Sequence, residues 1–123
     1  MGRTPLFHTI KVKGLPKAKS APEELFALQL RAEGIAFTRE VRVCAGRRWR
    51  LDFAIVEAPS ALTRQRGPLA VEIDGWGRHQ RFKGFEEDRV KDALALITGW
   101  CVLHVTPAQV KNGLALGWVK QLI

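Results

Sequence analysis

Two kinds of segment are missing from this chain. No apolar run is long enough to cross a membrane, and the first residues lack the apolar core of a secretory signal. We therefore expect a cytoplasmic protein that does not associate with membranes. Cysteine is also scarce. Cys44 and Cys101 stand alone, without the spacing of a metal site, so core packing is their favoured role and a disulfide stays open.

Acidic residues are too few to balance the basic ones. Lys and Arg total 20 against 12 Asp and Glu, which gives a net charge of +8 and a pI near 10.2. Such an excess favours a polyanionic partner, most often nucleic acid, although a merely soluble basic surface would give the same sum. No helix-turn-helix, zinc-finger or RNA-binding signature is present, so sequence-specific readout is not expected.

A length of 123 residues fits one folded domain with its own core. Residues 1–19 contain four lysines together with Gly14 and Pro16, and we interpret them as an extended basic N-terminal arm. Residues 20–123 then form the domain. We find no internal repeat.

Apolar periodicity predicts three helices and four strands. The first helix begins with a capping box at Ser20 and Glu23, and the last begins with a second one at Thr106 and Gln109. The middle helix, residues 85–98, carries an apolar stripe that should face the core. That stripe contains Val90, Ala93, Leu94 and Ile97. The predicted strands are residues 37–43, 49–56, 69–75 and 100–105. A polar loop over residues 57–68 should join the second strand to the third.

This order predicts an α/β fold of the pattern αβββαβα. Three sequential strands imply an antiparallel meander, and a strand reached through a helix implies a parallel crossover. We therefore expect a small mixed four-stranded sheet flanked by helices on both faces.

Three carboxylates fall on two adjacent predicted strands. Glu72 and Asp74 are two residues apart and share one side of a strand, while Asp52 interrupts an apolar run. A buried carboxylate is costly unless a cation or hydrogen-bond donors meet it, so a divalent-metal site would explain all three. A solvated strand face for Glu72 and Asp74, with Asp52 as a satisfied turn residue, explains them equally well.

The element order, with Asp52 on the second strand and Glu72-Ile73-Asp74 on the third, resembles the PD-(D/E)XK nuclease superfamily and its restriction-endonuclease-like core. It is most similar to compact phage and bacterial endonucleases of the very-short-patch-repair and DUF559 types. The matching segments are residues 22–30 (PEELFALQL), 48–53 (RWRLDF), 71–75 (VEIDG), 77–79 (GRH), 84–88 (GFEED) with Lys91, and 99–103 (GWCVL).

The resemblance implies hydrolysis of DNA phosphodiester bonds with Mg²⁺, for which Mn²⁺ could substitute. Asp52, Glu72 and the carbonyl of Ile73 would be the metal ligands, because hard cations prefer oxygen. Glu23 would reach the same ion through water or hold a second one. Its capping box with Ser20 is an equal alternative, and Glu24 is the neighbour that a shift of register would select.

The chain departs from this family at Asp74, where the third-strand signature usually ends in lysine. Lys91, one helix later, is the candidate replacement, and a simple helical pair with Glu87 is its alternative. His79 could orient the water, protonate the leaving oxygen or contact a phosphate. His104 lies in a strand of buried type and is interpreted as structural.

Basic residues in the predicted loops would neutralise phosphates near the carboxylates. They are Arg47, Arg48, Arg64, Arg66, Arg78, Arg81 and Lys83. Trp76 and Phe82 could stack on a distorted base, although Trp76 could equally close the edge of the core. A metal-dependent DNA endonuclease that is structure-specific or only weakly sequence-specific is therefore the leading hypothesis. A catalytically weak DNA-binding module with the same fold is the alternative, RNA is a third partner to consider, and a homodimer stays open.

Overall fold

The computed structural model describes residues 20–44, 49–58, 60–75 and 82–123. The strands are β1 (Phe37–Arg42), β2 (Arg50–Ile55), β3 (Leu69–Ile73) and β4 (Cys101–Val105). The helices are α1 (Ala21–Ala32), α2 (Ala61–Arg66), α3 (Phe82–Ile97), α4 (Pro107–Lys111) and α5 (Leu114–Leu122). The predicted basic arm lies outside the described residues.

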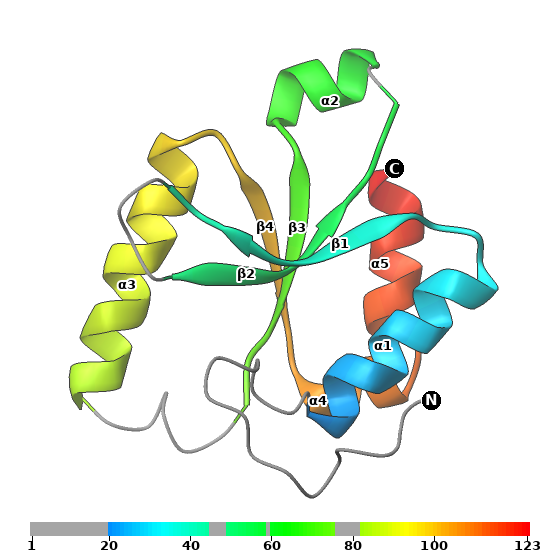
Figure 1. Ribbon diagram of the computed structural model, residues 1–123, viewed down its shortest axis with the longest axis horizontal. Helices are drawn as coiled ribbons and strands as arrows, with labels where there is room; N and C mark the ends of the chain where they lie inside the picture. The colour runs from blue at the N-terminus through cyan, green and yellow to red at the C-terminus, as the bar shows by residue number, and fades with distance from the viewer. Residues whose placement is uncertain (1–19, 45–48, 59, 76–81) are drawn as a thin grey trace, which may run out of the picture.

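The four strands form one mixed sheet in the order β1-β2-β3-β4 (Figure 1). β1 pairs with β2 and β2 with β3 in antiparallel fashion, and β4 pairs in parallel with β3. This confirms the predicted antiparallel meander with one parallel strand. No described helix has the length and apolar character needed to span a membrane.

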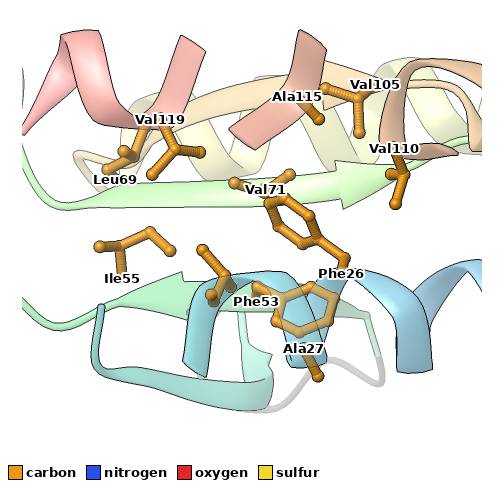
Figure 2. Close-up of a cluster of buried hydrophobic side chains, with 11 residues drawn as sticks. Phe26, Ala27, Phe53, Ile55, Leu69, Val71, Val105, Val110, Ala115 and Val119 are labelled. Carbon is orange, nitrogen blue, oxygen red and sulfur yellow. The ribbon is translucent and has the colours of Figure 1, made fainter. Parts of the chain in front are cut away.

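Helices cover both faces of the sheet. α1, α4 and α5 pack on one face, where the Phe26 ring of α1 meets the Phe53 ring of β2 edge-on at 5.1 Å between centroids (Figure 2). α3 covers the other face over a smaller cluster that includes Leu51, Ala70 and Ala95. The larger core therefore lies between β2, β3 and the C-terminal helices, and it holds the middle of the sheet rigid.

Arg39 lies on the apolar side of β1, and its positive charge is paired. Its guanidinium lies over the Phe53 ring, 5.1 Å from the centroid, and donates to Glu24 Oε2 at 2.9 Å. A guanidinium can stack on an aromatic ring while it pairs with a carboxylate. The side chains of β1 can therefore still alternate between the two faces of the sheet at this position.

The orientation predicted for α3 is wrong. Val90, Ala93 and Ile97, which were expected to face the core, are exposed, and only Leu94 of the stripe packs against the sheet. The buried side of α3 instead includes Asp88 and Ala95. Two charged side chains of this helix, Asp88 and Lys91, are therefore turned inward, and much of its apolar surface faces solvent.

The C-terminal segment is also different from the prediction, because it forms two short helices and not one. Both predicted capping boxes are present, at Ser20 and at Thr106. Gly113, however, adopts φ +87°, a left-handed conformation that interrupts the helix between α4 and α5. Asn112 Oδ1 then accepts the Leu114 N–H at 3.0 Å and starts α5.

The segment predicted as a polar loop contains α2. Ser60 caps this helix by accepting the Thr63 N–H at 3.1 Å. Arg66, at its end, pairs with Glu57 and donates to the carbonyl of Leu122 at 2.8 Å. The side chains of Arg66 and Glu57 are only 12% and 10% exposed, so this pair ties α2 to the C-terminus of α5.

We predict that Arg66→Ala destabilises the fold by about 2–4 kcal/mol, because it leaves the Glu57 carboxylate buried without its cation. Urea denaturation of the variant measures this loss. Arg64→Ala is the matched control, since Arg64 is exposed on the same helix. Equal stability of the two variants would show that the Arg66–Glu57 pair contributes nothing.

Candidate active site

The candidate site lies where β2 and β3 stop pairing. The residues that pair across these two strands are Phe53 with Val71 and Ala54 with Ala70. One residue further on, the Asp52 N–H donates to Glu72 Oε2 at 2.8 Å, and Asp52 Oδ2 accepts the Ile73 N–H at 2.8 Å. The carboxylates thus take the place of the strand-to-strand hydrogen bonds, which holds both of them in defined positions.

Lys91 supplies a cation to this pair of carboxylates from α3. Its Nζ donates to Glu72 Oε1, and the two side chains are only 15% and 9% exposed. The helical alternative, Glu87, is exposed to solvent. The catalytic hypothesis requires Lys91 to reach Glu72 from α3, and the structure has this contact. The catalytic role of Lys91 stays a prediction.

Asp52 is electrostatically the most perturbed acid of the site. Burial, the nearby Glu72 carboxylate and, to a smaller extent, Glu23 raise the pKa of Asp52 to about 7 from its ordinary value of 3.8. The Ile73 N–H and the Lys91 ammonium oppose this rise in pKa without cancelling it. When Asp52 is ionised, the site therefore carries two neighbouring carboxylate charges, and a bound cation would reduce the repulsion between them.

Glu23 takes part in the capping box and also lies close to the site. Its Oε1 accepts the Ser20 N–H at 3.1 Å, and its charge raises the pKa of Asp52. The two sequence interpretations of Glu23 are therefore compatible. Glu24, the register alternative, points elsewhere and pairs with Arg39 at 2.9 Å.

A histidine that sequence reasoning set aside lies next to these carboxylates. His104 was interpreted as a structural residue of a buried strand, but its side chain is 38% exposed. Its Nδ1 is 2.9 Å from Asp74 Oδ2, and its Nε2 is 3.4 Å from Asp92 Oδ1. The hydrogen bond with Asp74 is the main reason that the pKa of His104 is raised. The parallel register that sets Glu72 beside His104 is the signal that could have found it.

A small cleft joins the two groups of side chains. It encloses about 20 Å³, room for one water molecule or ion. Its walls are formed by Glu72, Asp74, Asp88, Arg89, Lys91, Asp92 and His104. Within the described ranges, no three or more His, Cys, Asp or Glu side chains gather in an arrangement suited to a metal ion.

Several predicted site residues lie outside the described part of the chain. These are Arg47, Arg48, Trp76, Arg78, His79 and Arg81, together with the side chains of Phe82 and Lys83. Arg64 and Arg66 are described, and the expectation that they flank the carboxylates is wrong. Both belong to α2, which precedes β3, whereas Asp74 follows its other end (Figure 1). Arg66 is moreover engaged inside the fold.

We predict that Asp52→Asn is more stable than the wild type at pH 8. The amide carries no charge to repel Glu72, and its oxygen can still accept the Ile73 N–H. Because the pKa of Asp52 is higher in the folded state, the wild type loses stability as pH rises from about 4 to about 7, and the variant does not. Thermal unfolding measures the difference, at roughly 5 °C for each kcal/mol.

The same experiment with added Mn²⁺ tests the metal hypothesis without an activity assay. Binding to the folded state raises Tm for the wild type, while Asp52→Asn should show little response because it lacks one ligand.

In the comparison at pH 8 without metal, a Tm of Asp52→Asn below that of the wild type would contradict the stability prediction. It would mean that the hydrogen bonds of the Asp52 carboxylate outweigh its repulsion from Glu72.

Comparisons with known proteins leave the chain without an assigned family. No family model matches it, and no curated protein and no solved structure matches it either.

Proposed function

We propose that this protein is a divalent-metal-dependent endonuclease that hydrolyses DNA phosphodiester bonds with little sequence specificity. The contact between Lys91 and Glu72, directly beside Asp52, is the observation that carries the proposal. Asp52 and Glu72 are the acids that the resemblance to the PD-(D/E)XK superfamily implied on the second and third strands, and Lys91 on the next helix is the candidate replacement for the lysine that position 74 lacks.

The donor set suits a hard divalent cation such as Mg²⁺, with Mn²⁺ as a substitute. Asp52 and Glu72 would hold it through oxygen, helped by the Ile73 carbonyl, and Glu23 would take part through water or a second ion. When bound, such an ion would activate a water molecule and neutralise the charge that develops on the phosphate. The raised pKa of Asp52 is consistent with this fit, because burial and the neighbouring Glu72 carboxylate disfavour the charged form of Asp52 and a bound cation would favour it.

Lys91 would act as the cation that the third strand lacks. Its ammonium already neutralises Glu72, and from the same position it can donate to an oxygen of a phosphate that carries developing charge. Asp74, which stands where the family has its lysine, has His104 as a partner. The lysine function is therefore proposed to come from α3, which β3 and β4 hold in place.

DNA is the proposed substrate because the chain carries a net charge of +8. Basic residues between β1 and β2 and in the segment that follows β3 would contact phosphates without reading bases. A location in the cytoplasm, where DNA of a bacterium or phage is accessible, is part of this proposal.

Lys91→Ala should reduce the DNA cleavage rate about a hundredfold, the scale of losing one transition-state donor. DNA binding should change little. Since Glu72 loses its buried partner, rates must be compared at a temperature where circular dichroism shows the variant folded. Lys120→Ala is the matched control, because Lys120, on α5, forms an exposed pair with Glu33 at the end of α1.

A wild-type rate in folded Lys91→Ala would remove Lys91 from the mechanism. If the wild type binds DNA but cleaves nothing with Mg²⁺ or Mn²⁺ across duplex, branched and single-stranded substrates, the DNA-binding alternative replaces the nuclease.

Replacing Arg78 and Arg81 by Ala should weaken binding to every DNA sequence alike. Each lost phosphate contact should reduce the slope of log affinity against log salt by about one unit. Fluorescence anisotropy over a salt series measures both effects. Arg64→Ala, at the opposite end of β3 from Asp74, should leave affinity unchanged, and a loss restricted to one sequence would indicate base readout.

A further inference from the structure

β4 is an edge strand, and its outer side has no neighbouring strand within the described residues. The Cys101 N–H donates to the Pro68 carbonyl at 2.9 Å, and the Val105 carbonyl accepts the Asp74 N–H at 2.7 Å. Both bonds run towards the β3 side. Because the peptide groups of successive strand residues point in opposite directions, the N–H and C=O groups of Val102 and His104 face the open edge.

The two edges of the sheet are protected very differently. β1, at the other edge, carries Arg39, Glu40 and Arg42, and Glu40 adopts φ +53°, which distorts the strand. Charges and backbone irregularities of this kind discourage strand addition. β4 contains no Lys, Arg, Asp, Glu or Pro along its five residues. Its edge is therefore open to a further strand.

Apolar surface adjoins this open edge. Leu96 and Ile97 at the end of α3 are 75% and 77% exposed. Leu96 also lines a groove of about 270 Å³ beside β4, together with Asp92, Trp100, Val102 and His104. Exposed apolar side chains next to unpaired backbone groups mark an interaction surface.

The local charge allows a second copy of this basic chain to approach here. Residues 85–97 of α3 contain four acids and two basic residues, against a net charge of +8 for the whole protein. β4 adds no charged side chain except His104 when it is protonated. Two copies that meet at this face keep their basic surfaces apart, and Asp92, the acid that lines the groove, is paired with Arg89 and lies next to His104 in each copy.

We propose that β4 and the adjoining side of α3 form a homodimer interface, in which β4 pairs antiparallel with β4 of a second copy about a two-fold axis. The outward peptide groups select the register. If Val102 lies opposite His104 of the second copy, all the outward N–H and C=O groups of both strands are paired, and the two Leu103 residues meet at the axis. This inference does not depend on the proposed enzymatic activity.

Sedimentation of the full chain over a wide concentration range tests the interface. The wild type should reach a dimer as concentration rises, and Leu96→Glu should weaken association about tenfold or more because it places like charges at the contact. Leu28→Glu is the matched control, since Leu28 is 62% exposed on α1, across the sheet from α3. A wild type that stays monomeric, or equal effects of the two variants, would overturn the proposal.

The register has its own test. Cα atoms of a non-hydrogen-bonded antiparallel pair lie about 4.5 Å apart, within the range of a disulfide. Leu103→Cys should therefore form a covalent dimer under mild oxidation, with the link mapped between the introduced cysteines by mass spectrometry. Thr38→Cys, on the opposite edge strand, should not. A sedimentation dimer without the Leu103→Cys link would contradict the strand pairing proposed here.

Discussion

The burial of two carboxylates between neighbouring strands is the constraint on which this structure depends. Asp52 and Glu72 sit where β2 and β3 cease to pair, and they are held by two backbone N–H groups and the Lys91 ammonium. Leaving such a charge unpaired in the interior costs several kcal/mol, so each of these donors is needed. They also determine how far the strands pair and which side of α3 must face the sheet.

The orientation of α3 follows from that requirement. Turning Val90 and Ile97 inward would gain about 1.5–3 kcal/mol for each side chain at full burial. It would also carry Lys91 away from Glu72, at a cost of the same order. The two terms are of the same order, and the observed orientation keeps Lys91 on Glu72 and leaves the apolar stripe outside. The same choice leaves apolar surface beside the unprotected edge of β4, so the candidate site and the proposed interface have a common physical origin.

Asp74 shows how a departure from a familiar motif can be absorbed by its surroundings. At the place where the resemblance would put a lysine, the carboxylate lies 2.9 Å from His104, whose other nitrogen faces Asp92. These carboxylates favour the imidazolium and raise the pKa of His104. Glu72 and Asp74 therefore have separate partners, Lys91 for Glu72 and His104 for Asp74, and both partners come from elements that follow β3 in the chain.

The sequence by itself determined the order of the strands, the mixed sheet and both capping boxes, because alternation and end signals are local. Tertiary structure decided the rest. The side of α3 that is buried depends on Glu72, nineteen positions earlier in the chain. The break between α4 and α5 depends on the left-handed backbone of Gly113, and α2 is tied into the fold by the ion pair of Arg66 with Glu57. Apolar periodicity predicts neither feature. His104 joins the site only because β4 lies parallel to β3, which brings together residues that no sequence window contains.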